Sequence, residues 1–186
     1  MDRIAMRECG DCQLCCKLLP VPPLNKGAGE RCQHQKFGKG CAVYRKPGMP
    51  LDCALWNCRW LVNDDTAELS RPDRSHVVID IMPDFISIRN DDSGEIQKIQ
   101  VAQVWIDPKY PDAHRDPALR AWVARRAAQG IATMVRFNAK DAITIFAPPL
   151  TPDDAWHEIT GNCEPEHSVE SVAQALGVNV KPKMTD

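Results

Sequence analysis

The clearest pattern of hydrophobic and polar positions begins near residue 76 and predicts a set of strands. The segments His76–Ile81 and Phe85–Arg89 are rich in β-branched residues, which favours strands. The run Asn90–Gly94 combines Asn, Asp, Ser and Gly and is typical of a turn. We therefore expect a hairpin from Phe85 onward whose second arm is Ile96–Ile106.

A helix with one apolar face is predicted to follow the hairpin. Asp116 is suited to the N-cap and Pro117 to the first helical position, while Gly130 is suited to the end. Between them, apolar residues recur at helical spacing. These residues are Leu119, Trp122, Val123 and Ala127. We expect this face of the helix to pack on the core.

Two further strands and two helices complete the predicted order. Ile131–Phe137 alternates in character and Ala142–Ala147 follows a polar turn, so both segments predict strands. A short helix is expected after Thr151-Pro152, and a last helix over Ser168–Leu176. The order βββ-α-ββ-α predicts an α+β fold in which a mostly antiparallel sheet carries helices on one face.

The first 60 residues lack such periodicity and predict loops. Proline and glycine recur between Cys16 and Cys32 and again before Cys41 and Cys53, which breaks any long helix. We expect a small, loop-rich, metal-bound cysteine module over residues 1–62, an α+β domain over residues 63–180 and a tail over residues 181–186. Four aromatic side chains among the cysteines are expected to pack over the sulfurs and exclude water. These are Phe37, Tyr44, Trp56 and Trp60.

Eight of the nine cysteines are concentrated in this module, and they predict metal binding. They are Cys9, Cys12, Cys15, Cys16, Cys32, Cys41, Cys53 and Cys58. The CxxC spacing of the first three suits either a zinc site or an iron–sulfur cluster, and a metal site would supply roughly 10 kcal/mol of folding free energy that the loops lack. Adjacent side chains rarely chelate one ion, so we expect Cys15 and Cys16 to serve different centres. Eight thiols divide into two four-cysteine sites; in one partition Cys9, Cys12 and Cys15 share a site with a downstream cysteine, and the assignment stays open.

The same residues resemble a known family. The pattern Cys9-x-x-Cys12-x-x-Cys15-Cys16, followed in order by Cys32, by Cys41-Ala-Val-Tyr44-Arg45 and by Cys53 with Cys58-Arg-Trp60, resembles the CxxCxxCC cysteine-cluster proteins (YkgJ-type). The resemblance covers the first third of the chain and implies a zinc- or iron-chelating domain. One departure is Lys46, which separates Arg45 from Pro47 where the family usually has Arg-Pro. A similar cluster occurs in a flagellin lysine methylase, but no nucleotide-binding glycine loop follows a strand in this sequence, so the sequence does not predict methylase activity.

Other candidate residues carry weaker signals. His34 lies two residues after Cys32 and is either a ligand in place of a cysteine or a surface histidine. Cys163, the ninth cysteine, is expected to be an incidental thiol. The remaining histidines show no ligand spacing: His76, His114, His157 and His167. The acidic residues form no recognisable catalytic pair and are expected in solvated turns and caps: Asp107, Asp112, Asp116 and Glu158.

Charge and hydropathy indicate where in the cell the protein is expected and which classes of partner it is expected to bind. The net charge is −2, with a formal +5 in residues 1–60 and −7 in the rest, so we expect no nucleic-acid partner and interpret the basic half as compensation for thiolate charge. The first residues carry no apolar signal region, and no stretch approaches the ~18 apolar residues of a membrane span. We therefore expect a cytoplasmic protein, and in that reducing compartment a cysteine cluster binds metal more often than it forms disulfides.

These observations predict a cytoplasmic metal-binding protein with one or two thiolate-ligated centres, zinc or iron–sulfur. A purely structural metal module is an equal interpretation of the cluster. An iron–sulfur redox protein or enzyme is the first alternative, and a module that delivers metal to a client protein is the second. No catalytic residue is predicted.

Overall fold

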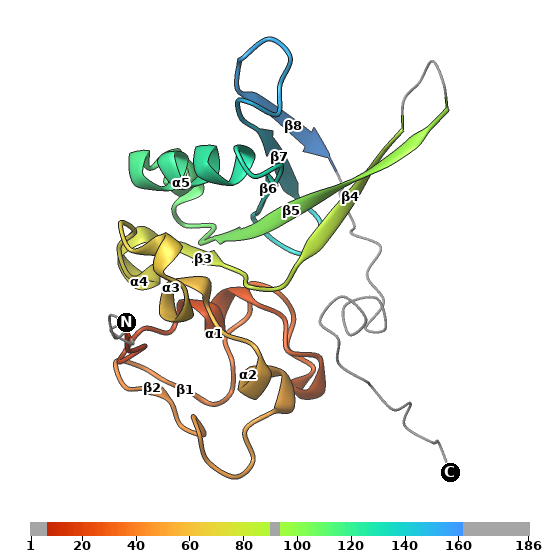
Figure 1. Ribbon diagram of the computed structural model, residues 1–186. Helices are drawn as coiled ribbons and strands as arrows, with labels where there is room; N and C mark the ends of the chain where they lie inside the picture. The colour runs from red at the N-terminus through yellow and green to blue at the C-terminus, as the bar shows by residue number, and fades with distance from the viewer. Residues whose placement is uncertain (1–6, 90–93, 162–186) are drawn as a thin grey trace, which may run out of the picture.

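The computed structural model describes residues 7–89 and 94–161 (Figure 1). Several predicted features lie outside these residues. They are most of the turn at Asn90–Gly94, Cys163, His167, the helix over Ser168–Leu176 and the tail over residues 181–186.

The chain has an α+β fold, as predicted. Residues 7–62, the described part of the cysteine module, contain only short elements. They are α1 (Leu14–Leu18), the 3-10 turn η1 (Pro22–Leu24), β1 (Gln35–Lys36), β2 (Gly40–Cys41), α2 (Leu51–Leu55) and α3 (Arg59–Val62). The elements that follow are η2 (Asp64–Thr66), α4 (Pro72–Ser75), β3 (Val77–Ile79), β4 (Asp84–Arg89), β5 (Ile96–Ile106), η3 (Pro111–Arg115), α5 (Pro117–Ala127), β6 (Ala132–Arg136), β7 (Ala142–Phe146) and β8 (His157–Gly161).

A six-stranded sheet organises the second part of the chain. Its order is β3-β5-β6-β7-β8, and β4 also pairs with β5. The long strand β5 pairs with β4 along its first half and with β3 along its last residues, in the register Ile86↔Ile99 and Val78↔Trp105. All pairs are antiparallel except β5 with β6, because α5 lies between these two strands and returns the chain in the same direction. The expected mostly antiparallel sheet is therefore confirmed.

The predicted apolar face of α5 covers one face of the sheet. Asp116 caps the helix by accepting hydrogen bonds from Ala118 and Leu119 N–H at 3.0 and 3.1 Å. The four predicted core residues of the helix are all buried, and they pack with side chains from β3, β5, β6 and β7. Trp122, with no exposed surface, lies at the centre of this layer.

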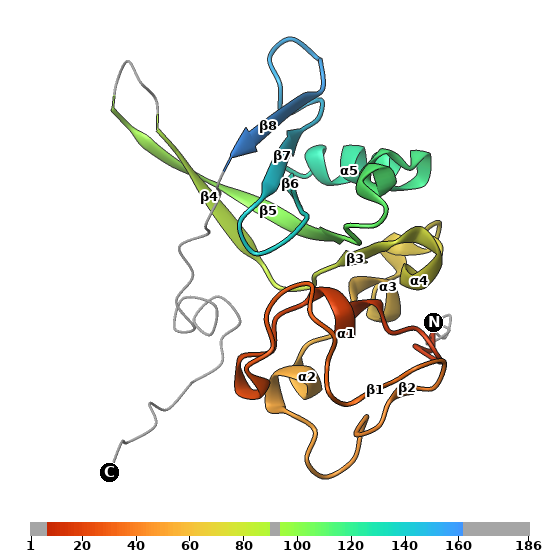
Figure 2. The same cartoon turned by 180° about the vertical axis from the view of Figure 1, so that it is seen from behind.

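The opposite face of the sheet meets the cysteine module. Because side chains alternate along a strand, Val78 and Trp105 point away from α5. They form a second apolar cluster with Leu14 and Leu18 of α1 and with Cys58. The views in Figures 1 and 2 agree that α1 and α3 lie against β3, with the loops of the module extending below. The cysteine module is therefore built onto the sheet through β3.

The short helix expected after Thr151-Pro152 is wrong. Residues 151–154 form a turn, and strand β8 follows it. Thr151 Oγ1 donates to Ala155 O at 2.8 Å, which closes the turn. The strand forms because β7 offers a free edge, with Thr144 paired to Ile159.

Within residues 7–89 and 94–161, the structure contains no helix with the length and apolar character needed to cross a membrane.

Candidate metal centre

The first cysteines lie in a tight turn that is held against the rest of the chain. Cys12 N–H donates to Cys9 O at 2.9 Å, and Gly10 between them has a φ of +53°, a conformation that favours glycine. Asp11 accepts from Arg71 at 2.7 Å, and Arg71 also binds Asp73 at 2.7 Å. This chain of ion pairs fixes the turn to the start of α4.

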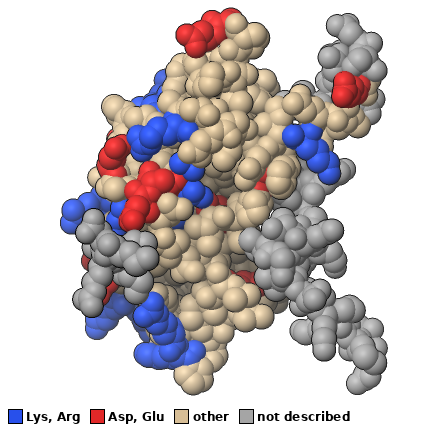
Figure 3. Space-filling view, in the orientation of Figure 1, with Lys and Arg blue, Asp and Glu red and all other residues tan. Residues whose placement is uncertain are grey.

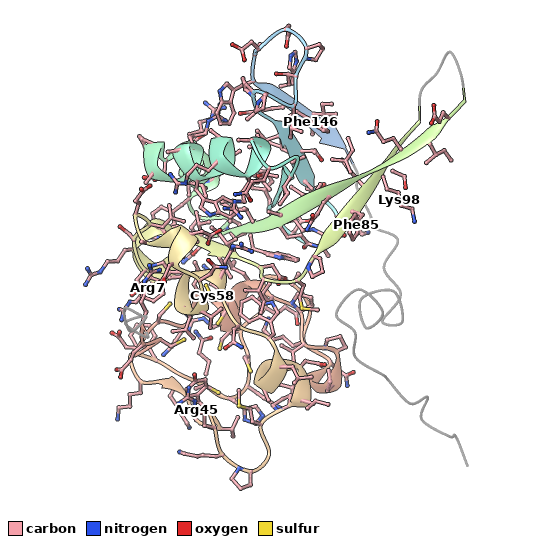
Figure 4. The ribbon with its side chains drawn as sticks, in the orientation of Figure 1. Arg7, Arg45, Cys58, Phe85, Lys98 and Phe146 are labelled. Carbon is pink, nitrogen blue, oxygen red and sulfur yellow. The ribbon has the colours of Figure 1, made fainter. Side chains whose placement is uncertain are left out.

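Cys58 lies at the boundary between the cysteine module and the sheet. It forms an isolated β-bridge with Asp80, just after β3, and only 7% of it is exposed. Figure 4 shows Cys58 at the level where the two parts of the chain meet. Burial raises the pKa of its thiol to about 11, although the N–H groups of Trp60 and Leu61 donate to the sulfur and oppose this effect. Such N–H donors stabilise a thiolate, the form that binds metal.

Cys58 belongs to a first group of thiols with Cys9 and Cys12. The charges of Cys12 and Cys9 both act to raise the pKa of Cys58, and Cys12 packs against the buried cluster that contains Cys58. Burial raises the pKa of Cys12 as well, while the N–H groups of Leu14 and Asp73 donate to its sulfur. Two of these three sulfurs therefore receive backbone donors before any metal is bound.

A second group of thiols surrounds Cys53 in α2. Burial raises the pKa of Cys53, and the charges of Cys16, Cys32 and Cys41 raise it further. The backbone brings these residues together, since Cys32 N–H donates to Cys16 O at 3.2 Å. The pairing of Gln35 with Cys41 in the β1–β2 hairpin then returns the chain toward Cys32.

Lys26 places a buried cation beside the second group. Its ammonium donates to Lys17 O and Gly27 O at 3.4 and 3.2 Å and also to Leu19 O, and the residue is 6% exposed. Burial lowers the pKa of Lys26, while the negative charges of Cys32 and Cys16 act to raise it. Lys26 forms no ion pair with a carboxylate in the described residues, although the charge of Glu30 also acts to raise its pKa, after those of Cys32 and Cys16.

Cys15 and Cys16 lie between the two groups and share a hydrogen bond. That bond, donated by Cys15, lowers the pKa of Cys16 to about 7 and raises the pKa of Cys15 well above its usual value. The charges of Cys9 and Cys12 also raise the pKa of Cys15, whereas Lys26 lowers that of Cys16. The charges of Cys9 and Cys12 thus act on Cys15, whereas the charge of Cys16 acts both on Cys9 of the first group and on Cys53 of the second.

The aromatic residues among the cysteines divide into two kinds. Trp56 and Trp60 pack on the cluster that contains Cys12, Cys15 and Cys58, as expected. Trp56 Nε1 also donates to Asp80 at 2.7 Å and Trp60 Nε1 to Leu69 O at 3.0 Å. The expectation is wrong for Phe37 and Tyr44, which are 84% and 40% exposed. Phe37 lies at the tip of the β1–β2 hairpin, and Tyr44 lies beyond its second strand.

The sequence analysis did not predict one ion pair that holds α1 in place. Asp107, expected in a solvated turn, is buried and forms an ion pair with Lys17 at 2.6 Å. Burial alone would raise the pKa of Asp107, but the Lys17 ammonium and the N–H of Lys109 outweigh it and hold the pKa below its usual value. Lys17 directly follows Cys16, so this pair ties α1 to the end of β5. No local signal connects two residues 90 positions apart.

The eight predicted ligands are all free thiols in the structure. Among residues 7–89 and 94–161, no three His, Cys, Asp or Glu side chains already have the arrangement of a metal site. His34 contributes its backbone O to the hairpin, accepting from Ala42 N–H at 2.8 Å. The donor set nevertheless fits a thiophilic metal, because eight thiols in two groups, with N–H donors and a buried cation nearby, match what thiolate centres require.

Comparisons with known proteins add no assignment: neither a protein-family model, nor a curated protein, nor a solved structure matches this chain.

Proposed function

We propose that this chain is a cytoplasmic metal-binding protein whose eight clustered cysteines hold two four-thiolate centres. The first centre consists of Cys9, Cys12, Cys15 and Cys58. The second consists of Cys16, Cys32, Cys41 and Cys53. The metal is zinc or an iron–sulfur cluster, and either would cross-link loops that bury little apolar surface.

One observation carries the proposal. Cys53 and Cys58 are separated by only four residues, yet their thiols have different neighbours. Cys53 is close to Cys16, Cys32 and Cys41, whereas Cys58 is close to Cys9 and Cys12. The two downstream cysteines therefore belong to different centres. This supports two separate sites over one large cluster.

The residues around each centre have distinct tasks. Trp56 and Trp60 exclude water from the first centre, and backbone N–H groups orient the sulfurs of Cys12 and Cys58. Lys26 offsets the charge of the second centre, which would be −2 for four thiolates on Zn²⁺. Sites with four protein ligands leave no open position, so the geometry favours a structural or electron-transfer role over metal-activated hydrolysis.

Metal and acid-labile sulfide content of anaerobically purified protein is the direct test. We expect about two zinc ions per chain without sulfide, or iron with matching sulfide and broad visible absorption. The free thiols of all eight cysteines suit a reducing compartment, so purification must avoid air.

Paired variants test the assignment of ligands. The double variant Cys9→Ser/Cys58→Ser removes ligands from one proposed centre and should lose one centre. The double variant Cys53→Ser/Cys58→Ser removes one ligand from each and should lose both. Cys163→Ser, the ninth cysteine, is the matched control and should keep full content. Equal losses in the two double variants, or a metal-free wild-type protein, would refute the proposal.

A further inference from the structure

The β1–β2 hairpin and its flanks carry positive charge without any carboxylate. Between residues 31 and 51 the chain contains five basic residues and no Asp or Glu. All five are exposed: Arg31, Lys36, Lys39, Arg45 and Lys46. Figure 3 shows Lys and Arg side chains at the lower end of the molecule, and Figure 4 places Arg45 there, away from the sheet. We call residues 31–46 the basic hairpin.

These cations differ from five arginines elsewhere in the described residues. In the described residues no member of the basic hairpin forms an ion pair, and Lys46 donates only to Ala42 O at 3.1 Å. Five arginines elsewhere each lie within 3.1 Å of a carboxylate: Arg59, Arg71, Arg120, Arg125 and Arg126. The hairpin cations are therefore available to an external anion, although the charge of Arg45 also acts on the Cys9 thiol.

Two aromatic rings lie among these cations. Phe37, at the tip, is 84% exposed, and Tyr44, after β2, is 40% exposed. The guanidinium of Arg31 lies 6.0 Å from the Phe37 ring centroid, and that of Arg45 lies 5.3 Å from the Tyr44 ring. An exposed phenylalanine gains nothing from the fold, whereas flat rings flanked by guanidinium groups are the usual platform for stacked bases.

The backbone holds this surface in a defined shape. The hairpin pairs Gln35 with Cys41, and Gly38 and Gly40 adopt φ values of +65° and +80° that allow the tight tip. A side chain at Gly40 would lie 3.0 Å from Gly10 O, so the hairpin packs closely on the turn between Cys9 and Cys12. The hairpin is therefore anchored beside its tip, since Gly40 pairs with Lys36, the residue before Phe37.

We propose that the basic hairpin binds single-stranded nucleic acid, with Phe37 and Tyr44 stacking on bases and the surrounding cations contacting phosphates. Unpaired strands expose the base faces that such rings need, and duplexes do not. An acidic peptide would use the cations but would gain little from the rings. The proposal departs from the sequence-based expectation of no nucleic-acid partner, because the net charge of −2 conceals a stretch, residues 31–51, with five basic residues and no Asp or Glu.

Fluorescence anisotropy with a labelled single-stranded RNA 12-mer tests the proposal on the full-length, metal-loaded protein. Wild-type protein should bind the strand more tightly than a duplex of the same sequence. Phe37→Leu, which keeps apolar bulk but removes the ring, should weaken binding about tenfold, since a stacked base contributes this much. With four or five phosphate contacts, raising salt from 50 to 200 mM should weaken binding roughly 50- to 130-fold.

Charge variants and a second ligand complete the experiment. Lys36→Glu/Lys39→Glu should abolish binding, whereas Lys98→Glu/Lys109→Glu, the same charge change at exposed lysines outside the hairpin, should leave it within about twofold. Metal content, measured on every variant, separates loss of binding from loss of the proposed centres. Equal affinity of Phe37→Leu and wild type, or tighter binding of polyglutamate than of the RNA strand, would overturn the proposal, and the latter would indicate an acidic protein partner.

Discussion

The Lys17–Asp107 ion pair should stabilise the contact between the cysteine module and the sheet. Lys17 Nζ lies 2.6 Å from both carboxylate oxygens of Asp107, and the two side chains are 24% and 7% exposed. Loss of one partner costs about 3–5 kcal/mol in buried pairs, and exposed pairs contribute about 0–1 kcal/mol. We therefore expect a coupling free energy of about 2 kcal/mol for this partly buried pair.

A double-mutant cycle in urea measures this coupling. The variants are Lys17→Met, Asp107→Asn and the double variant, and Asn keeps an oxygen that can accept from Lys109 N–H. With a denaturant slope of about 2 kcal/mol/M, the coupling corresponds to a shift of about 1 M in the unfolding midpoint. The exposed pair Arg115–Asp112, with a 3.6 Å separation, serves as control and should give at most about 0.5 kcal/mol.

The pH dependence of the same cycle supplies a second readout. The pKa of Asp107 in the folded protein lies below its usual value, so the unfolded chain binds more protons as pH falls. The stabilisation by Asp107 is thus complete above the unfolded pKa of about 3.9 and is lost as pH falls through the folded pKa. The difference between wild type and Asp107→Asn should be constant near neutral pH and shrink below about pH 4. A coupling no larger than that of the control pair would refute the reasoning.

Two further predictions concern buried residues on either side of the module boundary. Trp122→Ala should destabilise the protein by about 3–5 kcal/mol in urea unfolding, because the ring is fully buried, with the guanidinium groups of Arg59 and Arg126 at 5.9 and 5.6 Å. Trp122→Phe should cost clearly less, since the indole N–H has no hydrogen-bond partner among the described residues. Lys26→Met should weaken metal binding about tenfold in competition with a chelator, and only for one of two metal equivalents, because its ammonium lies beside the Cys16 and Cys32 thiols. Equal weakening of both equivalents would contradict the assignment of Lys26 to the second centre.

The elements that could be predicted from the sequence are those with local signals. Strand β5 was predicted with its observed bounds, and α5 with its observed start, since alternation, capping and a proline at the first position all lie within the elements themselves. Strand β8 was missed because the turn chemistry of Thr151–Asp154 resembles a helix start, while its pairing with β7 is a long-range contact. The parallel pairing of β5 and β6 likewise follows from the position of α5 rather than from either strand.

The sequence predicts which residues belong to the candidate site. It does not predict how these residues are arranged in space. The eight cysteines are visible in the sequence, but the neighbours of Cys58 depend on its bridge to Asp80. The exposure of Phe37 and Tyr44 was predicted wrongly, because composition cannot distinguish an aromatic that covers a sulfur from one that faces solvent. Asp107 was missed for a similar reason, as its partner Lys17 is distant in the chain.

Because α1 packs against β3, the cysteine module depends on the sheet for its packing. Leu14 and Leu18 are only 7% and 2% exposed, and the surface that covers them includes Val78 and Trp105, which lie beyond residue 62. A fragment ending at residue 62 would expose this apolar patch and leave Cys58 without its bridge to Asp80. Transferring the eight cysteines to another protein would therefore require β3 and its neighbouring strand as well. These strands provide the apolar surface on which the first group of thiols packs.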